Sequence, residues 1–435
     1  MLDMKFIREN PEIVKESERK RFKDPSIVDK VLEYDKKWRE TIKELQMLQK
    51  KRNEKSQELA KMKKEGKEIN ESEKKKLREI SERIKELEKK AEEYLKKRDE
   101  LRYRIGNILH ESVPVGDDEE KDNEIVRTWG KIPEFDFNVK SHADLINILD
   151  VADTERAAKV IGSRFYYLKN ELVLLNLALI RFGFEHFIKK GYAPLWTPYM
   201  ISEKAMKGAS ELADFEETLY GIRNKDAYLI ATAEQSILAY HMDEVFLKEE
   251  LPLKYVGFST NFRREAGSHG KDTKGIFRVH QFDKVEQIVF CLPEESWDWH
   301  EKMICYAEEI YQALGLPYRV VNICSGEMND NAAKKYDIEV WFPAQGKYRE
   351  VVSGSNCTDY QARKLNIKWR EKEGAKPKGY VHILNCTGIA TERTMCAILE
   401  NYQKEDGTVE IPKVLRPYMN GITEIKPKSE KDGKN

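Results

Sequence analysis

The chain has 435 residues, enough for two or three domains, and its 77 lysine and arginine residues are matched by 77 aspartate and glutamate residues. The charge is uneven, because residues 1–110 hold 33 basic and 25 acidic residues, a net charge of +8, and the remainder carries −8. No apolar run reaches the ~18 residues of a membrane span and the six cysteines include no CxxC pair, so we expect no membrane partner and a cytoplasmic protein with reduced thiols.

The N-terminal part is predicted to be helical. Apolar residues recur at heptad spacing over residues 27–62 and again over residues 77–108, where Arg98 alone breaks the pattern. Gly66 suits the end of the first long helix, and Asn70 suits a cap on the second. We therefore expect an antiparallel coiled-coil hairpin about 55–60 Å long, at 1.5 Å per residue.

The charge of this hairpin leaves its partner open. An isolated coiled coil favours a dimerisation or scaffolding stalk whose lysine excess keeps it solvated, whereas a basic arm on an acidic body favours a polyanionic partner. Residues 111–140, rich in proline and acidic residues, are expected to link the arm of residues 1–110 to a body of residues 141–420. Residues 421–435 are expected to form a disordered charged tail.

The body begins with elements typical of a buried core. Residues 165–190 predict a helix that is apolar almost all round, and residues 191–198 continue it into an edge strand. Residues 228–234 predict a strand that ends in Thr232-Ala233-Glu234 before the next helix. A carboxylate beside a hydroxyl can hold an ammonium group, although a threonine here equally suits a helix cap.

Residues 255–291 predict two strands joined by a glycine-rich polar loop, with flanks at 255–262 and 275–291. Alternate positions of the second strand share one polar face. Phe282 and Glu286 would lie about 13 Å apart on it, so a ring could stack at one end and a small polar group could be gripped at the other. The alternative is a solvated face with salt bridges. Arg278, His280, Phe282, Lys284 and Glu286 form the face.

Two later stretches complete the predicted sheet. Residues 337–342 and 347–353 are expected to form a hairpin. A strand over residues 380–385 leads through Thr387 into a helix that starts near Arg393.

Residues 262–267 (FRREAG) and 278–286 (RVHQFDKVE) resemble motif 2 of the seryl-tRNA synthetases, which are class II aminoacyl-tRNA synthetases. The resemblance extends to about residue 418. It implies an α+β fold, in which an N-terminal antiparallel α-helical coiled-coil hairpin precedes a catalytic domain built on an antiparallel β-sheet flanked by helices. Residues 191–198 resemble motif 1, with Pro198 in the dimer interface, and residues 386–393 resemble motif 3.

The resemblance also implies roles for single residues. Arg263 would bridge the α-phosphate of ATP and the serine carboxylate, Phe282 would stack on the adenine, and Glu286 would accept the serine hydroxyl. Glu350 and Ser353, from an ExxS pattern, would hold Mg²⁺. The implied serine-binding residues are Thr232, Ala233, Glu234, Arg263, Glu286 and Thr387. The implied ATP-binding residues are Arg263, Arg264, Glu265, Arg278, Val279, Phe282, Glu350, Val351, Val352, Ser353 and Arg393.

Two residues depart from the bacterial form of motif 3. Thr387 stands where that form has Ser and Glu392 where it has Gly, which is closer to archaeal and eukaryotic members. Glu392 is expected to temper the charge of Arg393. Arg278 and His280 are expected to meet the outer phosphates.

We therefore predict a homodimeric serine–tRNA ligase. It would form seryl-adenylate and pyrophosphate from ATP and L-serine, and pass serine to the terminal adenosine of tRNA(Ser). Its arm would reach the long variable arm of that tRNA, and we expect no DNA partner. Whether the tRNA for selenocysteine, tRNA(Sec), is also charged stays open. The alternatives are a ligase that loads a small amino acid on a carrier protein and a non-enzymatic RNA-binding scaffold.

Overall fold

The computed structural model describes residues 1–66, 70–211, 218–265 and 274–427. The chain divides into two compact units, one of residues Leu2–Gly106 and one from Asn107 onward that includes Met1. Within the described residues, no helix combines the length and the apolar character that crossing a membrane requires.

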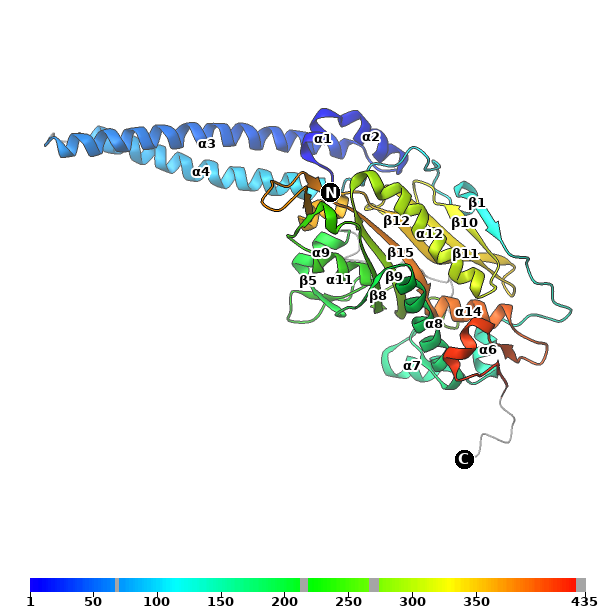
Figure 1. Cartoon of the computed structure of the whole chain (residues 1–435). Helices are drawn as coiled ribbons and strands as arrows, with labels where there is room; N and C mark the ends of the chain where they lie inside the picture. Colours follow the sequence, from blue (N-terminus) through cyan, green and yellow to red (C-terminus); the bar gives the residue numbers. More distant parts are fainter. Residues whose placement is uncertain (67–69, 212–217, 266–273, 428–435) are drawn as a thin grey trace. The chain divides into compact units, whose positions relative to one another are not determined.

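The first unit is a long helical hairpin that follows two short helices (Figure 1). α1 (Met4–Glu9) and α2 (Pro11–Lys20) lead into α3 (Ser26–Lys64), and α4 (Glu71–Arg102) returns beside it. α3 has 39 residues and spans about 58 Å at 1.5 Å per residue, as expected. α4 has 32 residues and ends before the heptad pattern does.

The ends of the hairpin helices follow from the sequence. Gly66 adopts a φ of 70°, a left-handed conformation that favours glycine after a helix. The Asn70 side chain accepts a hydrogen bond from the Ser72 backbone N–H at 3.0 Å, and so caps α4. Both predicted helix signals are confirmed.

Arg98, the break in the second heptad run, pairs with a carboxylate that the pattern did not reveal. Asp35 is fully buried, and its carboxylate lies 3.2 Å from the Arg98 guanidinium, 3.1 Å from that of Arg8 and 2.9 Å from that of Arg39. A buried charge is tolerated where every member of the cluster is paired. Beside this cluster the seam is apolar, and Leu45, Ile84 and Leu87 are buried in it.

The second unit is built on an eight-stranded sheet with the order β1-β10-β11-β12-β15-β9-β8-β4. Neighbouring strands are antiparallel except β8 and β4, which confirms the predicted sheet type. Helices α8 (Asn170–Lys189), α12 (Ser296–Ala313) and α14 (Thr391–Asn401) share one apolar core with the sheet (Figure 1). The strands are β1 (Glu124–Trp129), β4 (Ala193–Trp196), β8 (Leu253–Phe262), β9 (Gln281–Cys291), β10 (Tyr318–Asn322), β11 (Lys334–Phe342), β12 (Lys347–Asn356) and β15 (His382–Ala390).

Shorter elements surround this sheet. The helices are α5 (Glu119–Asp122), α6 (His142–Ile148), α7 (Thr154–Ile161), α9 (Glu203–Ala209), α11 (Ala233–Tyr240), α13 (Tyr360–Leu365) and the 3₁₀ turns Lys248–Glu250, Pro293–Glu295 and Lys413–Met419. The strands are β2 (Ala152–Asp153), β3 (Tyr167–Leu168), β5 (Met200–Ser202), β6 (Ala227–Leu229), β7 (Val245–Leu247), β13 (Lys368–Arg370), β14 (Gly379–Tyr380), β16 (Val409–Glu410) and β17 (Glu424–Ile425).

Several boundaries differ from the prediction, among them those of the linker and of the 255–291 hairpin. Residues 111–140 are more than a linker, because they contain β1, which pairs with β10 and forms one edge of the large sheet. The second strand of the 255–291 hairpin starts at Gln281, because the His280 N–H donates to the Arg164 carbonyl at 3.0 Å instead of joining the strand ladder.

Two further predicted segments lie partly outside the residues that the structure describes. In the tail, expected to be disordered, β17 pairs with β16, and residues 428–435 lie outside the described part. Most of the predicted glycine-rich loop, residues 266–273, also lies outside it.

Candidate active site

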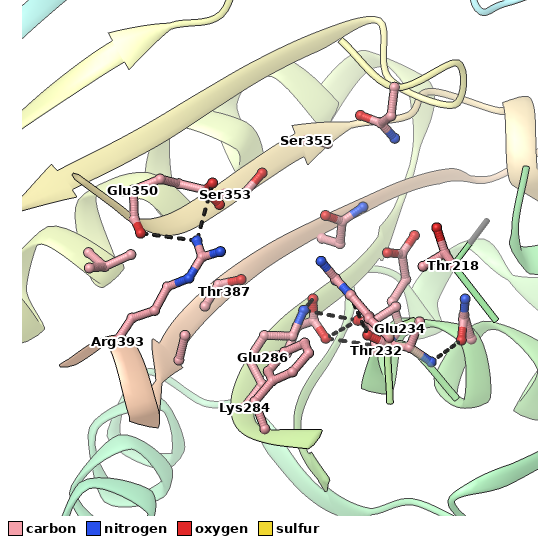
Figure 2. A pocket seen from close by; sticks show the side chains of 18 of the residues that line it. Thr218, Thr232, Glu234, Lys284, Glu286, Glu350, Ser353, Ser355, Thr387 and Arg393 are labelled. Carbon is pink, nitrogen blue, oxygen red and sulfur yellow. Dashed lines mark hydrogen bonds and ion pairs between the residues drawn. The ribbon is translucent and has the colours of Figure 1, made fainter. Parts of the chain in front are cut away.

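Polar side chains from several elements meet in one cavity of about 420 Å³ in the second unit. β9, β12 and β15 form its floor, and the first turns of α11 and α14 contribute to its walls (Figure 2). The predicted site residues that line it are Thr232, Glu234, Arg263, Glu265, Arg278, Val279, Phe282, Glu286, Glu350, Val351, Ser353, Thr387 and Arg393.

Two irregularities in the strands aim these side chains into the cavity. Glu350 and Ser353 are three positions apart and would face opposite sides of a regular strand. The register between β11 and β12 shifts at Val351, so both side chains line the cavity. The register between β15 and β9 also shifts, directly after Thr387. At Thr387 itself the two strands are still paired, and this residue lies opposite Glu286 on β9.

At one end of the cavity, polar groups surround the buried carboxylate of Glu286. The Thr232 hydroxyl donates to it at 2.5 Å, and the Lys284 ammonium donates to it at 2.7 Å. Lys284 also donates to the Thr232 hydroxyl at 3.1 Å. That hydroxyl accepts from the Glu234 backbone N–H at 3.3 Å and caps α11. Thr232 is therefore both a helix cap and part of the site.

Glu234 is the second carboxylate at this end. It accepts a hydrogen bond from the Gln361 side-chain amide at 2.6 Å. Burial raises the pKa of Glu234 to about 7, and the nearby negative charge of Glu286 acts in the same direction. A cation placed beside Glu234 would favour its ionised form.

Farther along the cavity, a cation and an aromatic ring lie together. The Arg263 guanidinium lies 5.2 Å from the centre of the Phe282 ring, and its Nε donates to the Ala231 carbonyl at 3.2 Å. Glu265 and Arg278 form an ion pair at 3.2 Å. The arrangement offers a flat apolar face next to fixed charge.

Glu350 and Arg393 form an ion pair at 3.2 Å, and the Arg393 guanidinium also donates to the Glu350 carbonyl at 3.0 Å (Figure 2). Burial by itself would raise the pKa of Glu350, but the positive charges of Arg393 and Lys335 outweigh it and hold that pKa below its usual range. Glu350 is therefore ionised and suited to a cation.

Two family models match the chain. The model of the seryl-tRNA synthetase N-terminal domain matches residues 1–109, and that of the tRNA synthetase class II core domain (G, H, P, S and T) matches residues 215–402. The serine–tRNA ligase of Methanosphaera stadtmanae is 54% identical over 430 residues, which cover 98% of this chain and 100% of that protein. The chain belongs to the seryl-tRNA synthetases. The serine–tRNA ligase of Thermococcus kodakarensis is 51% identical over 99% of both chains.

Solved structures of seryl-tRNA synthetases agree with this membership. The crystal structure of seryl-tRNA synthetase from Pyrococcus horikoshii complexed with ATP is 50% identical, covers 99% of this chain and 100% of its own, and has a TM-score of 0.92. That of the cytoplasmic serine–tRNA ligase from Naegleria fowleri with AMP is 44% identical over 99% of both chains, with a TM-score of 0.86. The predicted family, fold class and activity are confirmed. This seryl-tRNA synthetase is an aminoacyl-tRNA ligase that charges tRNA with serine, and the carrier-protein alternative is not favoured.

Some implied site residues of this seryl-tRNA synthetase are not among those that line the cavity. Ala233 and Val352 are fully buried, and Arg264 is exposed two residues beyond the end of β8. His280 is held away from the cavity, because its ring stacks on Phe165 at 5.1 Å and its Nδ1 bonds the Arg263 carbonyl at 2.8 Å. His280 thus contacts the Arg263 backbone from outside the cavity.

Four other lining residues received no individual role from the sequence: Phe277, Lys335, Asn385 and Lys284, the last of which was placed on the predicted polar face. Lys284, Lys335 and Asn385 each lie two positions along a strand from a predicted site residue or from another charged residue. Side chains two positions apart on a strand share a face. Phe277 carried no such signal. It lies under the guanidinium of Arg349 at 4.4 Å and that of Arg393 at 5.1 Å, contacts between residues far apart in sequence.

Glu392 does not have the expected role of tempering the charge of Arg393. Its carboxylate is buried and accepts from the Asp283 backbone N–H at 3.0 Å, from the Thr391 hydroxyl at 3.1 Å and from the Tyr166 hydroxyl. Burial raises the pKa of Glu392 to about 8, and the charge of Asp283 adds to this. Glu392 therefore fastens α14 to β9 next to Phe282.

Proposed function

We propose that this cavity is where the enzyme condenses L-serine and ATP to seryl-adenylate. The observation that carries the proposal is that a cation, Arg263, and a buried carboxylate, Glu286, line the same cavity. The serine carboxylate and the α-phosphate are both anionic, so a cation is needed where they meet. The ATP complex of the Pyrococcus horikoshii relative supports ATP as the nucleotide.

The end around Glu286 would bind serine. Glu234 would pair with the ammonium group, while Glu286 and Thr387 would meet the hydroxyl. Thr232 already donates to Glu286 and fixes its orientation. Alanine would leave the buried carboxylate without a donor, a mismatch that costs factors of about 10⁴. Threonine would be excluded by lack of space for its methyl group.

The other end would bind the nucleotide. Phe282 would stack on one face of the adenine and Arg393 would cover the other. Glu265 and the Val279 backbone would meet the adenine edge, and Arg278 would approach the outer phosphates. The Glu265–Arg278 ion pair holds both side chains ready at the cavity wall.

The donor set of Glu350 and Ser353 fits Mg²⁺. Among the described residues, no group of three or more histidine, cysteine, aspartate or glutamate side chains could hold a metal by itself. One carboxylate and one hydroxyl suit Mg²⁺, which keeps most of its shell as water and phosphate oxygen. Bound Mg²⁺ would neutralise phosphate charge.

The protein's contribution to the first step is then position and charge. The serine carboxylate attacks the α-phosphorus and pyrophosphate leaves, while Arg263 stabilises the charge that gathers between the two anions. The carboxylate is already a nucleophile at neutral pH, so the step needs no covalent enzyme intermediate and no general base.

The remaining expectations extend the proposal to the whole chain. Residues 1–110 would be the tRNA-binding arm, with lysine and arginine contacts to the phosphates of the long variable arm of tRNA(Ser), and the match of the N-terminal family model supports this. Residues 141–420 would form the catalytic domain. Two copies would pair through the segment around Pro198, and the enzyme would act in the cytoplasm.

Substitution of Arg263 tests the proposal. Arg263→Ala should lower serine-dependent ATP–pyrophosphate exchange by at least about 100-fold, because it removes the cation proposed to lie between the serine carboxylate and the α-phosphate. Arg264→Ala is the control, because it removes the arginine at the next position, which is exposed and does not line the cavity. This variant should lower exchange far less. Equal losses in the two variants, or retained exchange in Arg263→Ala, would contradict the role of Arg263.

A further inference from the structure

Lys284 is a charged residue at the serine end of the cavity to which the proposed mechanism gives no task. It is 6% exposed and lines the cavity. Its ammonium donates to Glu286 at 2.7 Å and to the Thr232 hydroxyl at 3.1 Å, which leaves it one further proton to donate. A buried lysine is costly to maintain, so its presence beside the substrate calls for a physical explanation.

The charges at this end balance one another once serine is bound. Arg263 would face the serine carboxylate, Glu234 would face the ammonium group, and Glu286 already faces Lys284. The subsite that receives the side chain is therefore a neutral ion pair and not a lone carboxylate. A lone buried carboxylate would attract any cation, whereas a neutral pair offers one acceptor and one donor.

A hydroxyl matches this pair and an ammonium group does not. The serine hydroxyl can donate to Glu286 and accept from Lys284 at the same time, because it has one proton and two lone pairs. An ammonium group of the same size has three protons and no lone pair, so it cannot accept from Lys284. It would also lie beside a like charge in a partly desolvated site.

We propose that Lys284 is a specificity-determining residue that makes the side-chain subsite accept a β-hydroxyl and reject a β-ammonium. The excluded class is represented by L-2,3-diaminopropionate, which differs from serine by an ammonium group in place of the hydroxyl. This is rejection by a built-in like charge, in addition to the attraction that Glu286 provides. The inference rests on the proposed assignment of Glu286 as the hydroxyl acceptor.

The test compares serine with L-2,3-diaminopropionate in ATP–pyrophosphate exchange at mildly acidic pH, where both amino groups of the analogue are protonated. In Lys284→Met, kcat/KM for serine should fall, and the ratio of diaminopropionate to serine should rise by at least about tenfold over the wild type. Lys284→Gln keeps a donor without the charge, so it should recover more serine activity than Lys284→Met and still raise the ratio. Each ratio is taken within one variant and does not depend on the fraction of folded enzyme.

Lys335→Met is the matched control. Lys335 lines the same cavity but pairs with Asp337 at 3.3 Å, away from the serine end. Its replacement should lower exchange with both amino acids and leave their ratio as in the wild type. If Lys284→Met exchanges neither amino acid, calorimetric titration of Lys284→Gln with the seryl and diaminopropionyl sulfamoyl adenosines, which cannot react, should show the same change of preference.

The outcomes distinguish a failure of this inference from a failure of the assignment on which it rests, that of Glu286 as the hydroxyl acceptor. Glu286→Met removes the hydrogen-bond acceptor and should lose the preference for serine over alanine, and if it keeps that preference, Glu286 is not the hydroxyl acceptor. If Glu286→Met behaves as expected while the diaminopropionate to serine ratio in both Lys284 variants equals that of the wild type, the selectivity role of Lys284 is overturned and the Glu286 assignment stands.

Discussion

At the scale of one residue, the proposed pairing of Glu234 with the serine ammonium predicts that serine recognition depends on pH. Burial raises the pKa of Glu234 to about 7, so the carboxyl is neutral below that pH and ionised above it. Only the ionised form attracts the serine ammonium. We therefore expect kcat/KM for serine in pyrophosphate exchange to fall about tenfold per pH unit below about pH 7, and to level off above it.

Glu234→Gln provides the comparison, because glutamine keeps the shape and stays neutral. This variant should be slow at every pH and should lack the acidic limb. Serine binding by the wild type near pH 7 should release protons, since the bound ammonium lowers the pKa of Glu234. Calorimetry in buffers of different ionisation enthalpy would measure that release. An acidic limb that persists in Glu234→Gln would assign the titration to another group.

Single residues also show where sequence reasoning succeeds and where it stops. Strand alternation and the family resemblance brought Phe282 and Glu286 to one face, and the structure places both in the cavity. Alternation alone would have separated Glu350 from Ser353, because the bulge at Val351 depends on the pairing with β11. The carboxylate of Glu392 could not be placed from sequence, since its partners on β9 and near Tyr166 are distant in the chain.

At the scale of elements, the helical hairpin was predictable because its heptads are local. The boundaries of the hairpin were less predictable. The chain from Asn107 onward belongs to the second unit, where the Asn107 side chain donates to the Asn331 and Cys357 carbonyls, both at 2.9 Å. No periodicity marks such a contact. A truncation intended to remove only the arm must therefore spare Asn107.

A shortened hairpin tests the proposed role of the arm. Deletion of residues 50–78, with a short glycine-serine turn between Gln49 and Glu79, keeps the buried layer of Leu45, Ile84 and Leu87. It removes many of the basic residues of the hairpin. Pyrophosphate exchange should stay within about twofold of the wild type, while kcat/KM for tRNA(Ser) charging should fall at least about 100-fold.

The control for this deletion is its salt dependence. Charging by the full-length enzyme should weaken steeply as salt rises, because phosphate contacts release counterions, and the shortened enzyme should show a smaller slope. Equal losses of exchange and charging would argue that the arm supports the catalytic unit and not the RNA.

At the scale of the whole molecule, both edge strands of the large sheet expose large apolar side chains, and those on and around β4 lie near Pro198. β4 forms one edge, and near it Trp196 is 68% exposed and Met200 57% exposed. Leu177, on the neighbouring helix α8, is 57% exposed. Large apolar side chains grouped in this way are typical of an interaction surface. Their closeness to Pro198 supports the proposal that a second copy of the chain covers them.

Charge placed on this surface should separate the copies. Leu177→Glu should raise the dissociation constant of the dimer by at least about 100-fold, because a carboxylate would be buried without a partner in the interface. Sedimentation velocity at micromolar concentration would then show a monomer. Ile125→Glu is the matched control, since Ile125 is 54% exposed on β1 at the opposite edge of the sheet and should leave the dimer intact. A monomeric wild type would contradict the proposed dimer, and a dimer that only Ile125→Glu dissociates would place the interface at β1 instead of β4.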